Sequence, residues 1–184
     1  MPPIWGTDVY PFIQEIQYNL PVFLTWIKIN VDAALSSSMV AIVGVARDFC
    51  SFLCSVWARL ISHRSPLQAE AEALIWAMQI AKRKGWQQVL FEGYSKICFD
   101  AISSANSSPN WAIQTTISNV LDRAQFLSSC SFVWIKRCCN SAAHVFAKFA
   151  LDSRLSCFFN KDNLPPTLDA VCKDDYLVCS CSSF

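Results

Sequence analysis

The stretch Ile27-Lys28-Ile29-Asn30-Val31-Asp32 decides the fold, because its side chains alternate between apolar and polar at every step. The apolar members fall on one face and the polar members on the other, which is the period of a β-strand. Two further apolar segments, 39–46 and 52–61, follow after short connections. Short connections favour antiparallel pairing, so residues 26–61 predict a meander of three antiparallel strands.

A helix is expected to begin after Ser65. Pro66 at the first helical position and Gln68 three residues after Ser65 form a capping-box pattern, and Gly85 is typical of the residue that follows a helix end. Between these limits apolar side chains recur at spacings of three and four, at Leu67, Ala71, Leu74, Met78 and Ala81. Glu70 lies on the same side of the helix as this stripe. A carboxylate there needs a partner, and the sequence leaves a divalent metal and a buried hydrogen bond or ion pair equally open.

The rest of the chain alternates between segments with strand and helix character. The expected elements are a strand at 89–91, helices at 95–102 and 113–127, a strand at 130–135, and a helix from the cap Asn140 to residue 153. Strand–helix–strand units imply parallel pairing through right-handed crossovers. The predicted fold is therefore α/β, with a mixed five-stranded sheet (three antiparallel strands plus parallel crossovers) flanked by helices. We assign residues 25–155 to this domain, 1–24 to an N-terminal extension and 156–184 to a C-terminal tail.

The composition limits the classes of partner. The net charge is +1, whereas dedicated nucleic-acid binders are usually more basic, so binding to nucleic acid would be weak or confined to a patch. Lys82-Arg83-Lys84 is the compact basic run, and it is typical of the solvated end of a helix, where cations favour the dipole. No apolar segment is long enough to span a bilayer, and the first residues do not resemble a secretory signal. We expect an intracellular protein with no membrane partner, and the sequence does not distinguish nucleus from cytosol.

Polar residues stand where such a sheet places its chemistry. Open α/β sheets carry their sites at the carboxyl ends of parallel strands. Asp32 closes the first strand and Tyr94 closes the fourth, so the two residues are neighbours if these strands pair in parallel. Glu70 lies early in the first helix and faces the sheet. The three side chains are therefore expected to converge.

Over residues 26–155 the chain resembles the ribonuclease H-like domain of plant retrotransposon-derived proteins, the reverse-transcriptase-like group. The matching segments, in this order and spacing, are Lys28–Ala34, Gly44–Asp48, Ser65–Leu74, Phe91–Lys96 and Arg137–Lys148. The resemblance implies a hydrolase, an endonuclease that cuts the RNA strand of an RNA–DNA hybrid with the help of two magnesium ions. Carboxylates hold the ions in such sites, because magnesium prefers hard oxygen ligands.

The resemblance assigns roles to four positions. Asp32 matches the acid that bridges both metals and Glu70 matches the helix acid, so these two are the expected metal ligands. Tyr94 stands where the family has its third acid, and His144 stands at the fourth catalytic position, on the last helix. A phenol is neutral near pH 7, so we expect hydrolysis to be weakened by about 10²–10⁴-fold, as when a positioned catalytic group is removed. His144 could ligate a metal, shuttle a proton or be a surface histidine.

The predicted function is that of a ribonuclease H-type nucleic-acid-binding domain that acts as a monomer on an RNA–DNA hybrid, with catalysis weakened at Tyr94. Two alternatives remain. One is a non-catalytic module that binds nucleic acid or another protein, and the other is a retrotransposon remnant.

Overall fold

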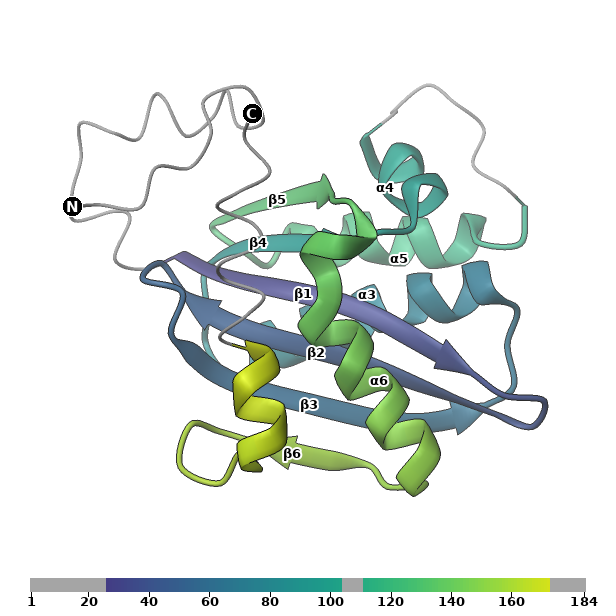
Figure 1. Cartoon of the computed structure of the whole chain (residues 1–184). Coiled ribbons are helices and arrows are strands. Elements are labelled where there is room, and N and C mark those ends of the chain that lie inside the picture. Colours follow the sequence, from purple (N-terminus) through teal and green to yellow (C-terminus); the bar gives the residue numbers. More distant parts are fainter. Residues whose placement is uncertain (1–25, 104–110, 173–184) are drawn as a thin grey trace.

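The computed structural model describes residues 26–103 and 111–172 (Figure 1). The elements in chain order are β1 (Trp26–Leu35), β2 (Met39–Asp48), β3 (Leu53–Ser62), α3 (Pro66–Arg83), β4 (Gln88–Gly93), α4 (Lys96–Ser103), α5 (Gln114–Ala124), β5 (Ser129–Trp134), the 3₁₀ turn η1 (Arg137–Asn140), α6 (Ser141–Ser153) and β6 (Cys157–Phe159). A further helical segment covers residues 166–172. The expected N-terminal extension, 1–24, and the last part of the expected tail, 173–184, lie outside the described residues.

The strands form one mixed sheet in the order β5-β4-β1-β2-β3-β6 (Figure 1). β1, β2 and β3 pair antiparallel, as the meander predicts. β4 pairs parallel with β1, and β5 pairs parallel with β4, as the crossovers predict. The prediction of five strands is wrong, because β6 adds a sixth strand, antiparallel to the outer edge of β3.

The sixth strand comes from the segment that we expected to be a tail. β6 covers the edge of β3, which would otherwise present unpaired backbone groups. Leu168 and Cys172, in the helical segment that follows, are buried against the cluster that includes Phe146 and Ala150 of α6. A strand of three residues has no readable period, and this is why the sequence pattern did not reveal it.

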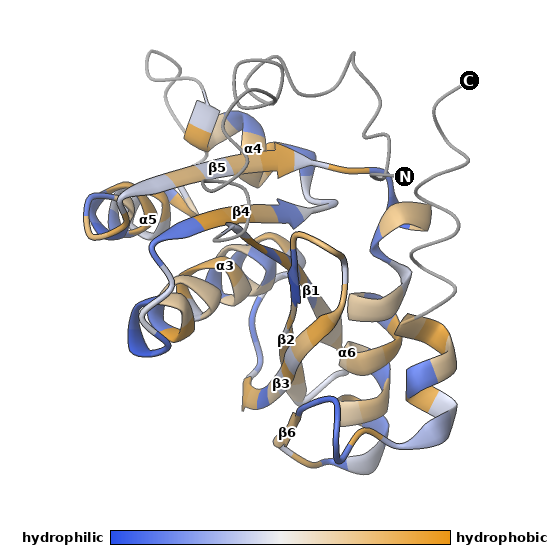
Figure 2. Ribbon diagram, turned by 90° about the vertical axis from the view of Figure 1, so that its left-hand side faces the viewer, coloured by the Kyte–Doolittle hydropathy of each residue, from blue (hydrophilic) through white to orange (hydrophobic). Residues whose placement is uncertain are grey.

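Helices cover both faces of the sheet. Figure 2 shows α3 and α5 on one side and α6 on the other. Ile29 and Val31, on one face of β1, belong to the core that α3 covers. Val43 and Val45 of β2 belong to the core that α6 covers. Within residues 26–103 and 111–172, no helix combines the length and the apolar character that crossing a membrane requires.

The ends of the helices test the capping predictions. The capping box at the start of α3 is confirmed, since the Ser65 hydroxyl accepts from the Gln68 N–H at 3.3 Å and the Gln68 Oε1 accepts from the Ser65 N–H at 3.2 Å. Gly85 has φ of +71° after the end of α3, as expected of a residue in this position. Asn140 does not cap α6 with its side chain, contrary to expectation, because its Nδ2 donates instead to the carbonyl of Val31 at 2.9 Å.

Candidate active site

Asp32 lies inside β1 and is fully buried. The expectation that it closes the strand is wrong, because β1 continues to Leu35 and Asp32 still pairs with Val43 of β2. One carboxylate oxygen, Oδ1, accepts from the Ala33 N–H at 2.8 Å. The other, Oδ2, lies 3.0 Å from Nδ1 of His144. Both oxygens of this buried carboxylate therefore have partners.

Tyr94 follows β4 directly and comes beside Asp32, as the parallel pairing predicts. The register pairs Asn30 with Glu92, so Tyr94, two residues beyond Glu92, stands level with Asp32. The Trp134 indole N–H holds this turn by donating to the Tyr94 carbonyl at 2.8 Å. The position of the phenol is thus set by backbone pairing on one side and by a side chain of β5 on the other.

Glu70 completes a cluster of three with Asp32 and Tyr94. It lies in the first half of α3 with 6% of its surface exposed, so its expected inward orientation is confirmed. The side chains of Tyr94 and Asp32 lie close enough to its carboxyl group to affect its ionisation. The sequence left a metal and a buried hydrogen bond or ion pair open as partners of Glu70, and the structure places Asp32 and Tyr94 beside its carboxyl group.

Burial dominates the ionisation of the cluster. It raises the pKa of Glu70 well above its ordinary value, and the negative charge of Asp32 adds to the rise. Burial also raises the pKa of Asp32, although the Ala33 N–H and His144 partly offset this. Burial, followed by the charges of Glu70 and Asp32, raises the pKa of Tyr94 to about 12. Tyr94 is therefore a neutral phenol at any pH near neutrality.

Arg137 and His144 form the outer side of the site. His144 lies in the first turn of α6, and Nη2 of Arg137, in η1, lies 3.2 Å from its Nε2. The same Nη2 lies 3.5 Å from Nδ1, so the guanidinium lies against the ring. An ionised carboxylate can only accept, so Nδ1 donates to Oδ2 of Asp32. The Arg137 guanidinium also lies over the Tyr94 ring, 5.1 Å from its centroid. Sequence reasoning gave Arg137 no individual role, because its contacts depend on the turn between β5 and α6.

A second cluster of buried polar side chains surrounds Asn30, two residues before Asp32 on β1. Nδ2 of Asn30 donates to Oε2 of Glu92 at 2.9 Å, and Nη1 of Arg47 donates to Oδ1 of Asn30 at 3.1 Å. Nζ of Lys28 lies 3.7 Å from the same Glu92 oxygen. These contacts join β1 to β2 and to β4, so they secure the register that places Tyr94 beside Asp32. The alternation of β1 put Lys28, Asn30 and Asp32 on one face, but it did not identify their partners.

The cluster does not fit a centre of two magnesium ions. Asp32 and Glu70 are the carboxylates that could supply oxygen ligands. In the part of the chain that the structure describes, however, no three His, Cys, Asp or Glu side chains are arranged to hold a metal ion. The Tyr94 side chain lies beside Glu70, and Nδ1 of His144 lies 3.0 Å from Oδ2 of Asp32. A metal ion at this place would have to displace these contacts, and the cluster has only two carboxylates to offer in return.

A family model and several solved structures are similar to this chain. The family model described as reverse transcriptase-like matches residues 30–150. The ribonuclease H1 of the halophilic archaeon Halobacterium salinarum has a TM-score of 0.65 at 19% identity, over 70% of this chain and 98% of that one. The N-terminal ribonuclease H domain of a Mycobacterium tuberculosis protein has a TM-score of 0.62 at 16% identity, over 70% of this chain and 95% of that one. LC11 ribonuclease H1, from a compost metagenome, was solved in complex with an RNA/DNA hybrid. It has a TM-score of 0.63 at 20% identity, and the match covers 71% of this chain and 99% of that one.

At these identities the likeness to the solved structures is one of fold. No curated protein sequence matches the chain. The family match, in contrast, extends over more than half of the chain and includes Asp32, Glu70, Tyr94 and His144. The chain belongs to the reverse transcriptase-like family, and it has the ribonuclease H fold.

Proposed function

We propose that the chain is a ribonuclease H-type nucleic-acid-binding domain of plant retrotransposon descent in which hydrolysis is weakened or lost. One observation carries the proposal. The position next to Asp32 and Glu70, where the resemblance places a third carboxylate, holds the phenol of Tyr94, whose pKa is raised to about 12 by burial and by the charges of Glu70 and Asp32. A neutral group there adds no negative charge for magnesium, and its ring takes up space in the site.

An RNA–DNA hybrid is the proposed partner. The support is the shared fold with LC11 ribonuclease H1, which was solved with an RNA/DNA hybrid. The exposed cations Lys136 and Arg137 lie at the start of η1, and Arg137 lies over the Tyr94 ring, so they supply positive charge at the mouth of the site. Lys96, which follows Tyr94 closely, is paired with Asp100 at 2.8 Å. Phosphate contacts of this kind provide most of the affinity for a nucleic acid, and they make it depend on salt. Because the net charge is only +1, we expect binding to be local and moderate.

A hydrolysis assay tests the catalytic part of the proposal. A labelled RNA–DNA hybrid is incubated with magnesium and the native chain, Tyr94→Asp, Tyr94→Phe or Asp32→Asn. We expect little cleavage by the native chain and a gain of about 10²-fold or more in Tyr94→Asp, because this variant restores the third carboxylate. Tyr94→Phe keeps the ring and lacks the hydroxyl, so it should not gain activity. Efficient cleavage by the native chain that Asp32→Asn abolishes would overturn the proposal of a weakened site.

Binding is measured separately, by fluorescence anisotropy with the same hybrid. Binding without cleavage in the native chain and in Tyr94→Asp would favour the non-catalytic module. Absence of binding in both would overturn the nucleic-acid-binding function altogether. Light scattering after size-exclusion chromatography should give the mass of a monomer, and a tagged chain should be found in the nucleus or the cytosol.

A further inference from the structure

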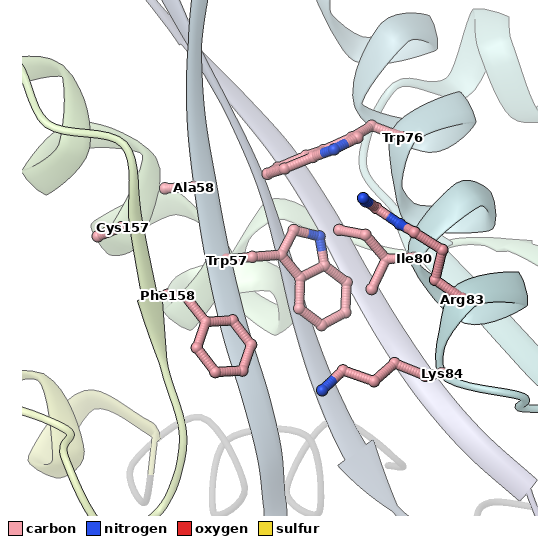
Figure 3. Close-up of a pocket in the computed structure, with 8 residues that line it drawn as sticks. All are labelled: Trp57, Ala58, Trp76, Ile80, Arg83, Lys84, Cys157 and Phe158. Atoms are coloured by element: carbon pink, nitrogen blue, oxygen red, sulfur yellow. The ribbon is translucent and has the colours of Figure 1, made fainter.

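A groove lies at the end of α3 that is remote from Glu70. Arg83 follows Glu70 along the same helix by about 20 Å, at 1.5 Å per residue. The groove has a volume of about 470 Å³ and is formed between α3 and the strands β3 and β6 (Figure 3). Its main lining residues are Trp57, Trp76, Ile80, Arg83, Lys84 and Phe158.

Aromatic rings form the base and sides of this groove. Trp57 is almost fully buried, and its indole packs so closely on Gly44 that a Cβ there would come within 2.6 Å of it. The Trp76 ring stands nearly perpendicular to Trp57, at 85° and 6.5 Å between centroids, and Trp86 supports Trp57 at 6.2 Å. Trp57 is therefore held from several sides. Phe158, on β6, is 48% exposed, so one part of its ring remains open to a ligand.

The charge of the groove has one sign. Figure 3 shows Arg83, at the end of α3, extending toward Trp76, and Lys84, which follows it, extending toward Trp57 and Phe158. Nζ of Lys84 lies 5.1 Å from the Phe158 ring centroid. Among the described residues that line the groove, none is acidic. The groove thus presents flat apolar surface and two cations at the same place.

We propose that this groove binds an unpaired nucleotide of a single-stranded nucleic acid. The base contacts Trp76 and Phe158 above the floor of Trp57, and the adjacent phosphates contact Arg83 and Lys84. Each nucleotide carries a planar ring and an anion side by side, so one unit satisfies both features of the groove. Stacking on aromatic side chains tolerates any base, and a guanidinium binds phosphate through paired hydrogen bonds. The volume lies within the range of small-ligand sites. This site uses none of the residues around Asp32, so a result that contradicts this site does not contradict the proposed function.

The basic run provides its own matched control. Lys82, Arg83 and Lys84 are adjacent, yet Nζ of Lys82 lies 3.9 Å from the ring centroid of Phe126, outside the groove. The probe is a short fluorescein-labelled oligothymidylate, and anisotropy is measured over a range of salt concentrations. The double substitution Arg83→Gln with Lys84→Gln should weaken binding and lower the steepness of the salt dependence by about 1.4, at about 0.7 per phosphate of a single strand. Lys82→Gln should bind like the native chain.

The aromatic part is tested with Phe158→Leu and with an abasic oligonucleotide. Phe158→Leu keeps apolar volume at a half-exposed position, so the fold should persist, which a circular dichroism spectrum checks. Loss of one stacking contact should weaken binding of oligothymidylate by about 5- to 150-fold. The abasic oligonucleotide should bind weakly to the native chain and should be insensitive to Phe158→Leu.

Four results would overturn the proposal. The first is an equal loss in Lys82→Gln and in the double variant Arg83→Gln with Lys84→Gln. The second is equal affinity for the abasic and the complete oligonucleotide, and the third is binding of an acidic aromatic peptide without binding of oligonucleotide. The fourth is loss of oligonucleotide binding in Asp32→Asn. The last result would mean that the single strand occupies the site around Asp32, and it would leave the proposed function intact. Conversely, groove variants that no longer bind the single strand but still bind the hybrid would support both proposals and would show that the two sites are separate.

Discussion

Nδ1 of His144 lies 3.0 Å from Oδ2 of Asp32, so the first turn of α6 is tied to the middle of β1. Nη2 of Arg137 lies 3.2 Å from Nε2 and 3.5 Å from Nδ1, so the guanidinium packs against the imidazole ring. A histidine at this position therefore acts in the folded chain as a partner of a buried acid. The three residues come from three different elements, and their contact closes the site on the side of α6.

The first prediction concerns this contact. His144→Ala leaves an oxygen of a fully buried carboxylate without its partner, so the free energy of unfolding should fall by about 1–3 kcal/mol in urea denaturation. Lys148→Ala, at an exposed position of the same helix, is the control and should cost much less. In an Asp32→Asn background the cost of His144→Ala should shrink. Additive effects of the two substitutions would contradict a direct interaction.

The second prediction is a pH dependence of stability. The folded-state pKa of Glu70 is raised by burial and by Asp32, so the folded chain keeps a proton that the unfolded chain releases near the ordinary value of 4.5. As the pH rises from there, Glu70 lowers stability by at most about 1.4 kcal/mol per pH unit until its folded-state pKa is passed. Glu70→Gln lacks this loss, so its free energy of unfolding should rise relative to that of the native chain as the pH rises above about 4.5. Glu72→Gln, on the same helix, is the matched control, and a difference between Glu70→Gln and the native chain that does not vary with pH would contradict the prediction.

The local patterns predicted most of the fold. Alternation in β1 and the capping box at Ser65 are short-range signals, and both elements formed where expected. β6 was missed, because a strand of three residues depends on the exposed edge of β3 for its formation. The same holds for the site. Asp32, Glu70 and Tyr94 were identified individually, but the contacts of Arg137 and the network of Asn30, Arg47 and Glu92 arise only when distant segments pack together.

The third prediction concerns magnesium and Tyr94→Asp. A third carboxylate beside Asp32 and Glu70 should destabilise the chain in the absence of metal, because like charges would be held together in a buried place. Magnesium should then stabilise this variant by about 1.4 kcal/mol at ten times its dissociation constant, a rise of about 3–6 °C in Tm. The native chain and Tyr94→Phe should show little change. An equal rise in all three chains would indicate that magnesium acts elsewhere.

The fourth prediction compares two glycines. A Cβ at Gly44 would meet the Trp57 indole at 2.6 Å, whereas a Cβ at Gly85 would meet nothing within 4 Å but would be strained by φ of +71°. Gly44→Ala should cost about 1–3 kcal/mol and should change the near-UV circular dichroism, because the Trp57 ring has to move. Gly85→Ala should cost about 1 kcal/mol and should leave that spectrum unchanged. Identical near-UV spectra in both variants would show that the core around Trp57 is looser than its contacts indicate.

The fifth prediction concerns the C-terminal segment that completes the sheet. Phe159 on β6 packs against Phe146 and Phe149 of α6, each at 6.3 Å between ring centroids. A chain that ends at residue 155 loses these contacts and opens the edge of β3, so it should melt at a lower temperature, bind a hydrophobic dye and aggregate. A chain that ends at residue 172 keeps β6 and the helical segment and should remain monodisperse. Phe159→Ala tests the contact alone and should cost about 2 kcal/mol, because the ring is only partly buried. If the chain ending at residue 155 were as stable as the one ending at residue 172, then β6 would be an attachment to a domain that is already complete.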